Sequence, residues 1–171
     1  MRAAILYSSV TGNTERVAAA IQEELEKQGN TVVFYGKPQE NVEADIYFAG
    51  SWTDKGTCSG EMALFLNHIE GGCVAWFGTA GFGGSEEYYR GIYKRVQENA
   101  SQEIRFLGYF YCQGRMPASI RDRYEKLLES SPSDGARFCA SIENYDKALS
   151  HPDEEDLRAV KRWVREMLSL V

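Results

Sequence analysis

Residues 3–14 read AAILYSSVTGNT, a short apolar run followed by a turn rich in hydroxyl groups. The apolar run Ala3–Tyr7 has the length and composition of a buried strand, and a pattern of helical period begins directly after the turn. A helix start offers unpaired N–H groups and partial positive charge, so such a turn can hold a phosphate without Lys or Arg. The stretch therefore predicts an anion site formed by backbone amides and the hydroxyls of Ser9, Thr11 and Thr14.

The turn lacks the signatures of other phosphate-binding loops. A P-loop would need G-x-x-x-x-G-K-[ST], and a dinucleotide-binding turn would need G-x-G-x-x-G with an acid after the second strand. A receiver domain would place acids where this chain has Ser8 and Ser9, and an Asp where it has Gly50 and Ser51. The simplest alternative is a plain turn with a helix cap, because Ser, Thr, Asn and Gly are common in both.

Short apolar runs alternate with segments of helical period over the first 112 residues. Buried strands are predicted at Ala3–Tyr7, Val32–Tyr35, Ile46–Ala49, Cys73–Phe77 and Ile104–Cys112. Helical stripes lie between most of them, at Val17, Ile21 and Leu25, at Met62, Phe65, Leu66 and Ile69, and at Tyr89, Ile92, Tyr93 and Val96. This alternation predicts a parallel α/β sheet, with a link at 36–44 too short for more than a turn of helix.

About sixty residues follow the fifth predicted strand, more than one closing helix requires. Two helical segments are predicted near 120–128 and 138–149, within an elaboration spanning about 116–150. A closing helix is predicted over about 152–169, with Pro152 at its first helical position and an apolar stripe that packs on the sheet. The whole chain, 1–171, is predicted to form a single domain.

Composition narrows the function classes. The chain has 171 residues, of which 43% are hydrophobic and 26% charged, as in an ordinary globular domain. The sequence has no run of about 18 apolar residues and no signal-peptide layout at its start, so we expect a cytoplasmic protein without membrane association. The net charge of -6 argues against nucleic acid as a partner.

Neither cysteines nor histidines form a metal or catalytic pattern. Cys58, Cys73, Cys112 and Cys139 are widely spaced, so we expect reduced thiols, most of them buried. The two histidines, His68 and His151, have no metal-ligand spacing and no nucleophile beside them. No metal site and no catalytic acid, base or nucleophile is predicted.

The turn S-V-T-G-N-T, residues 9–14, resembles the FMN-phosphate signature of the flavodoxin family, T/S-x-T-G-x-T. The loops at 50–57 and 78–85, rich in glycine and carrying Trp52 and Phe82, resemble the two flavodoxin loops that enclose the flavin ring. In doubly wound sheets the loops after strands one, three and four converge where the strand order reverses. The resemblance implies a flavodoxin-like doubly wound five-stranded parallel sheet of order 2-1-3-4-5, with extra C-terminal helices.

The resemblance also implies FMN as cofactor and a set of binding residues in the three loops. By the same resemblance, the Lys55–Gly56 peptide could turn its carbonyl toward flavin N5 on reduction. The implied set is Ser8, Ser9, Val10, Thr11, Gly12, Asn13 and Thr14 after strand one, Ser51, Trp52, Thr53, Asp54, Lys55 and Gly56 after strand three, and Thr79, Ala80, Gly81, Phe82 and Gly83 after strand four.

Cations near these loops depart from the family pattern, in which acids surround the flavin. Lys55 lies in one ring loop, Arg90 follows the other, and Gln113 and Arg115 follow strand five, where they could contact the flavin, a nicotinamide dinucleotide or an acidic substrate. The first hypothesis is an electron carrier between a reductase and an acceptor protein. The alternatives are an NAD(P)H-dependent FMN or quinone reductase that uses NAD(P)H or a small acceptor, and a cofactor-free interaction module.

Overall fold

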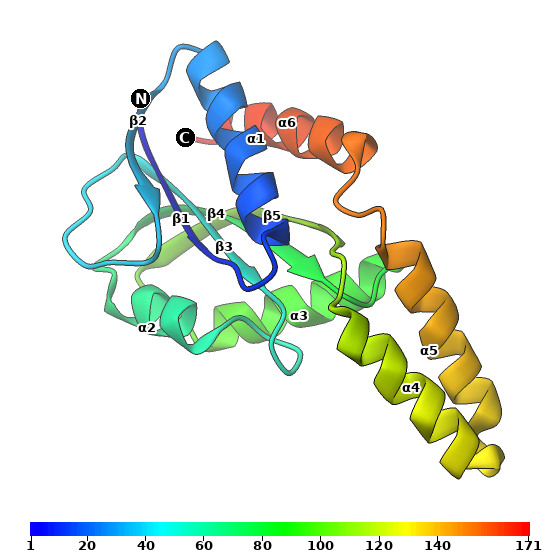
Figure 1. Cartoon of the computed structure of the whole chain (residues 1–171). Helices are drawn as coiled ribbons and strands as arrows, with labels where there is room; N and C mark the ends of the chain where they lie inside the picture. The colour runs from blue at the N-terminus through cyan, green and yellow to red at the C-terminus, as the bar shows by residue number, and fades with distance from the viewer.

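The computed structural model describes residues 1–171 and contains one five-stranded sheet between helices (Figure 1). The strand order is β2-β1-β3-β4-β5 and every neighbouring pair is parallel, which confirms the predicted topology. The strands are β1 (Arg2–Ser8), β2 (Thr31–Gly36), β3 (Ile46–Trp52), β4 (Gly72–Ala80) and β5 (Ile104–Gln113).

Two pairs of helices cover the two faces of the sheet. Helices α1 (Asn13–Lys27) and α6 (Glu154–Leu168) lie on one face, and α2 (Gly60–His68) and α3 (Glu86–Glu98) lie on the other (Figure 1). Because successive side chains of a strand point to opposite faces, β1 contributes to two cores: Ala3 and Ile5 join the cluster with α1 and α6, and Ala4 and Leu6 join the other. Burial on both faces explains the continuous apolar runs of the sequence.

The start of α6 differs from the prediction. Pro152 lies before the helix and not at its first position, which is Glu154. The N-cap is Asp153, whose carboxylate accepts from the backbone N–H groups of Glu155 and Asp156 at 2.8 and 2.9 Å. The Asp156 carboxylate in turn accepts from the Asp153 N–H at 2.9 Å. This reciprocal capping makes Asp153 the N-cap and Glu154 the first helical residue, so the prediction for Pro152 was wrong.

The predicted elaboration is a helical hairpin, α4 (Ala118–Ser130) and α5 (Gly135–Ala148), joined by the 3-10 turn η1 (Pro132–Asp134). It projects away from the sheet and its covering helices (Figure 1). No residue of α4 is buried, and no residue of 118–149 belongs to either core cluster. The base of the hairpin is closed, because the Arg115 N–H donates to the His151 carbonyl at 3.0 Å.

Three smaller observations concern the link after β2, the cysteines and the lengths of the helices. Residues 37–45 contain no helix, in keeping with the short link predicted there. The four cysteines are free thiols, but only Cys58 and Cys112 are buried, because Cys139 lies on the projecting α5 and Cys73 near the start of β4. None of the helices is both long and apolar enough to span a bilayer.

Candidate functional site

The turn between β1 and α1 leaves backbone amides open at a helix start. The Ser9 Oγ accepts from the Gly12 N–H at 3.1 Å, which folds the turn back on itself. Gly12 has φ +84°, a left-handed conformation that favours glycine. The N–H groups of Val10, Thr11 and Asn13 have no acceptor within the protein. Amides of this kind, at the positive end of a helix, form an anion site.

Asn13 links this turn to the segment after β5. Its Nδ2 donates to the Thr11 Oγ1 at 2.8 Å and to the Arg115 carbonyl at 2.9 Å. A Cβ on Gly114 would lie 2.6 Å from the same nitrogen, so glycine is required there for the close approach. Asn13 therefore sets the position of Arg115 relative to the open amides.

Two of the predicted phosphate-turn hydroxyls point into the protein. Thr14 has no exposed surface, and its Oγ1 lies 2.9 Å from the Oγ1 of Thr79. Ser8 is 3% exposed, and its hydroxyl donates to the Glu61 carboxylate of α2. The structure thus directs Thr14 and Ser8 toward neighbouring elements, while Ser9 and Thr11 remain in the turn.

The loop after β3 is a tight turn held at both ends. Asp54 and Thr57 exchange two backbone hydrogen bonds of 2.9 Å, and the central residues Lys55 and Gly56 have φ of 47° and 82°. Two successive positive φ values define a type I′ turn. Ser51 holds the end of the loop, because its Oγ accepts from the Ser59 N–H at 2.9 Å.

Arg95 of α3 fixes the tip of this turn, a contact that the sequence analysis did not foresee. Its Nε donates to the Gly56 carbonyl at 2.6 Å. This bond engages the Gly56–Thr57 peptide and leaves the Lys55–Gly56 peptide, for which a redox-linked role was predicted, free of Arg95. The contact joins residues 39 positions apart, and no local sequence pattern indicates it.

The loop after β4 is anchored by the segments that follow β5. The Gly81 carbonyl accepts from the Gln113 Nε2 at 3.2 Å and from the Asn144 Nδ2 of α5 at 3.0 Å. A Cβ on Gly81 would lie 2.5 Å from the Met116 Sδ. Gln113 thus acts as a support of this loop and is not free to turn toward a ligand.

These three loops close on one cavity of ≈ 420 Å³ at the carboxyl edge of the sheet. Eleven of the predicted binding residues line it, from all three loops: Val10, Thr11, Asn13, Trp52, Thr53, Lys55, Gly56, Thr79, Ala80, Gly81 and Phe82. The predicted residues outside the lining are Ser8, Ser9, Gly12, Thr14, Ser51, Asp54 and Gly83. All three predicted loops therefore contribute to the lining of one cavity.

The remaining lining residues come from α3, from the segment between β5 and α4, and from the first turn of α4. They are Tyr88, Gly114, Arg115, Met116, Pro117 and Ile120, of which the sequence analysis had weighed only Arg115. Tyr88 lies in the first turn of α3, three residues after the N-cap Ser85, whose side chain accepts from the Tyr88 N–H. Tyr88 follows the predicted ring loop at 78–85 closely in the sequence, which could have marked it as a lining residue. Nothing in the sequence near Ile120 indicates a place in the cavity.

Cations alone supply the charge of the cavity lining, through Lys55 and Arg115. The nearby acids Asp54, Glu86 and Glu87 do not line it. Arg90, a predicted candidate, also lies outside it and pairs with Glu86 at 3.7 Å on the surface. The field of the lining therefore favours a negative charge on a bound group.

A stack of aromatic side chains supports the cavity from α3 and β5. The rings of Tyr88 and Tyr89 have centroids 5.8 Å apart, and Tyr89 stacks on Tyr111 at 5.3 Å. The Tyr111 hydroxyl accepts from the Trp76 Nε1 at 2.9 Å. Burial raises the pKa of Tyr89 to about 12 and also raises that of Tyr88, so both phenols are neutral at ordinary pH.

The fold and the loops define the class of this protein. A sequence model of the flavodoxin domain matches residues 4–165, nearly the whole chain. The chain therefore belongs to the flavodoxin family.

Two relatives share almost the full length of the chain, and both are flavodoxin-like domain-containing proteins named BilS. The one from Clostridium symbiosum is 37% identical over 180 residues, covering 96% of this chain and 94% of the relative. The one from Clostridioides difficile is 32% identical over 173 residues, covering 98% and 97%. The similarity thus includes the region of the hairpin as well as the sheet.

Solved structures support the fold. A Streptococcus pneumoniae flavodoxin aligns over all of both chains with a TM-score of 0.60 at 17% identity. Oxidised Flavodoxin 2 from Bacillus cereus aligns over all of both chains with a TM-score of 0.59 at 19% identity. A Lactobacillus acidophilus flavoprotein in complex with FMN aligns over 64% of this chain and 92% of its own, with a TM-score of 0.52 at 17% identity.

Proposed function

We propose that this protein binds FMN in the cavity at the carboxyl edge of the sheet and carries electrons between redox partner proteins. The observation that carries the proposal is the convergence of three loops on one cavity, with open amides at one end and aromatic walls. Bound FMN would supply uptake and release of one or two electrons.

The residues present fit the two chemically different ends of FMN. The open N–H groups of Val10, Thr11 and Asn13 suit the phosphate, because they offer donors without a competing protein acceptor. Trp52, Tyr88 and Phe82 suit the flat ring, since aromatic faces bury it and exclude water. Lys55 and Arg115 favour the added negative charge of the reduced state.

The test compares FMN with riboflavin, which lacks only the phosphate. Cofactor-free protein should quench the fluorescence of FMN on saturable binding, and bind FMN at least about tenfold more tightly than riboflavin because of the amides in the first turn. The absence of saturable FMN binding would rule out both electron-transfer candidates and leave a cofactor-free interaction module. Equal affinities would show that the turn at 8–14 does not hold a phosphate.

An NAD(P)H-dependent reductase is the second candidate, favoured by the two cations of the lining. It would require the FMN-loaded protein to oxidise NAD(P)H alone when a soluble acceptor is present. A carrier would do so only after a separate flavodoxin reductase is added. A stepwise reductive titration of the bound flavin then shows whether it takes up electrons singly, as a carrier between unlike partners needs.

A further inference from the structure

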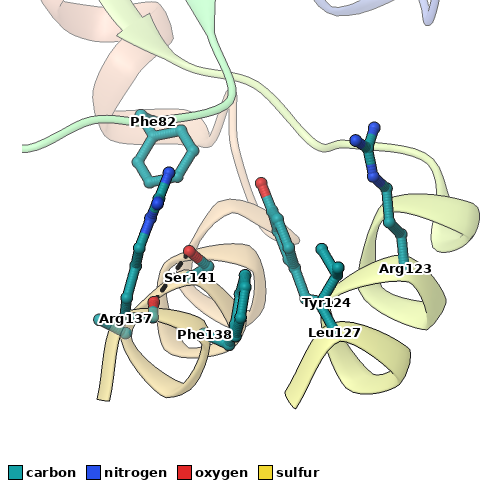
Figure 2. A pocket seen from close by; sticks show the side chains of 8 residues that line it. Phe82, Arg123, Tyr124, Leu127, Arg137, Phe138 and Ser141 are labelled. Atoms are coloured by element: carbon teal, nitrogen blue, oxygen red, sulfur yellow. Dashed lines mark hydrogen bonds between the residues drawn. The ribbon is translucent and has the colours of Figure 1, made fainter. Parts of the chain in front are cut away.

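A second cavity of ≈ 630 Å³ lies between α4 and α5 (Figure 2). Its walls are apolar side chains of both helices, namely Tyr124 and Leu127 from α4 and Phe138 from α5. In Figure 2, Arg123 and Arg137 stand on opposite sides of these three residues. The volume lies within the range of about 300 to 1,000 Å³ typical of small-molecule sites.

The apolar residues of this groove have no role in the core. Tyr124, Leu127 and Phe138 neither belong to nor pack against the two core clusters, so the fold of the sheet does not require them to be apolar. An apolar groove exposed on a projecting hairpin is a mark of a binding surface. The groove therefore needs an explanation outside the packing of the sheet.

The two arginines of the groove are also unpaired. Neither Arg123 nor Arg137 makes an ion pair, and no acid lines the groove. Arg121, on the same helix but outside the groove, pairs with both Glu125 and Asp146. Acids of the hairpin thus neutralise Arg121, which lies outside the groove. Arg123 and Arg137 in the groove remain available to an anion.

Phe82 connects the groove to the cofactor cavity, because its side chain lines both. It is 44% exposed, which is unusual for a phenylalanine in the middle of a glycine-rich loop. Asn144 of α5 donates to the carbonyl of the preceding Gly81, so the hairpin and the Phe82 loop are held together. A molecule in the groove would contact the same ring that borders the flavin cavity.

We propose that the groove between α4 and α5 binds a planar apolar carboxylate beside the flavin cavity, and that the groove offers the carboxylate one guanidinium group on each side, that of Arg123 and that of Arg137 (Figure 2). The walls match an aromatic or conjugated body, and the two guanidinium groups offer planar forks that suit carboxylate geometry. The significance of the position beside the flavin rests on the proposed function, whereas binding in the groove does not. A neutral ligand would leave both arginines unpaired.

The experiment titrates fluorescent naphthoate into the protein with and without FMN, using naphthalenemethanol as the uncharged counterpart. We expect saturable naphthoate binding that is at least about tenfold tighter than that of the alcohol and that weakens with added salt, because the arginines are exposed. The double variant Arg123→Gln/Arg137→Gln should weaken naphthoate at least about tenfold and leave the alcohol unchanged. Arg162→Gln, which removes an exposed arginine of α6, is the matched control and should have no effect.

A second variant tests the walls and a spectral readout tests the position. Phe138→Ala should weaken naphthoate and the alcohol alike, and naphthoate should shift the absorbance of bound FMN in the native protein but not in the double variant. Equal affinity for acid and alcohol, or a double variant that binds naphthoate normally, would overturn the proposal. Because the groove can be titrated in the cofactor-free protein, failure of FMN binding and failure of naphthoate binding are separate results.

Discussion

The two helical regions that follow β5 use their apolar residues in opposite ways. Helix α6 buries Val160, Trp163, Val164 and Met167 against the sheet. Helix α4 is almost as long and buries none of its residues. Burial of apolar residues by α6 stabilises the sheet, whereas α4 adds no buried residue to it. The difference teaches that the sheet with its covering helices provides the fold, whereas the hairpin adds Ile120 to the cofactor cavity and keeps its other apolar residues outside both cores.

The largest expected effect lies in the core. Trp163→Ala should lower the free energy of unfolding by about 3 to 5 kcal/mol, because the ring packs against Phe48 and Phe110 and would leave a cavity. Leu127→Ala in the hairpin should cost less than about 1 kcal/mol, since its side chain is only half-buried. Urea unfolding of the two variants measures both, and similar losses would break the comparison.

The affinity for FMN should depend on the turn between β1 and α1 and not on the tip of the hairpin. Thr11→Ala removes a hydroxyl next to the open amides and should weaken FMN by about 1 to 3 kcal/mol. Ser133→Ala, in the turn η1 of the hairpin, serves as the control and should leave the affinity unchanged. Fluorescence titration with FMN gives both values, and an unaltered Thr11→Ala protein would count against phosphate binding by this turn.

An acid-sensitive contact joins α1 to α6. Burial raises the pKa of the Glu24 carboxyl, but hydrogen bonds from Arg165 at 2.7 Å and Gln28 at 2.8 Å outweigh burial and hold the pKa below its ordinary value. A lowered folded-state pKa means that this stability is present above the ordinary value of 4.5 and is lost as pH falls through the folded-state pKa. Glu24→Gln should therefore cost about 1 to 2 kcal/mol at neutral pH and flatten the acid limb of the stability curve.

The hairpin offers the matched control for that measurement. Asp146 pairs with Arg121 on the exposed surface, so Asp146→Asn should change neither the stability nor its pH dependence by more than about 0.5 kcal/mol. Urea midpoints between neutral pH and about pH 3 report both variants. An acid limb that is equally flattened by the two substitutions would contradict the assignment.

The cations of the lining should set the potential of the bound flavin. Lys55→Gln removes a positive charge from the cavity and should lower the midpoint potential of a one-electron step by about 20 to 60 mV, the equivalent of up to about 1.4 kcal/mol. Arg162→Gln removes an exposed arginine of α6 that does not line the cavity, and it should leave the potential unchanged. A redox titration that shows a higher potential in Lys55→Gln would mean that other charges dominate.

The smallest effect is expected from removing the hairpin itself. Since the Arg115 N–H bonds to the His151 carbonyl, the base is already closed, and a short glycine-serine linker can join Pro117 to Ser150. The shortened protein should keep its circular dichroism spectrum and lose no more than about fivefold in FMN affinity, for the absent Ile120 and Asn144 contacts. Loss of the folded sheet would show that the hairpin supports it after all.

Regular patterns explain why the sheet could be predicted from sequence. The strands are buried on both faces, so their apolar runs are continuous, and the stripes at Val17 and Ile92 belong to helices that cover the sheet. The three loops were found because parallel strands end at one edge, which places the turn at 8–14 beside Trp52 and Phe82. Hairpin helices were also visible, since helical period is a local property.

Contacts between elements that are distant in the sequence could not be predicted from it. Arg95 reaches Gly56 and Asn144 reaches Gly81 because of how α3 and α5 lie on the sheet, and neither residue carries a local signal. The start of α6 was misplaced for a related reason, since Pro152 fits a first helical position until the mutual bonds of Asp153 and Asp156 are known. The inward direction of Thr14 at the start of α1 likewise depends on Thr79, a residue of the distant strand β4.

The shared Gly81 carbonyl joins the loop of the cofactor cavity to the hairpin that carries the groove. It accepts from Gln113 beside the sheet and from Asn144 of the hairpin, and Gln113 also donates to the Asn144 Oδ1 at 2.9 Å. A ligand that shifts α5 would thereby shift the loop that borders the flavin cavity. Thermodynamic linkage is reciprocal, so the factor by which FMN changes affinity for the groove must equal the factor by which an occupied groove changes affinity for FMN.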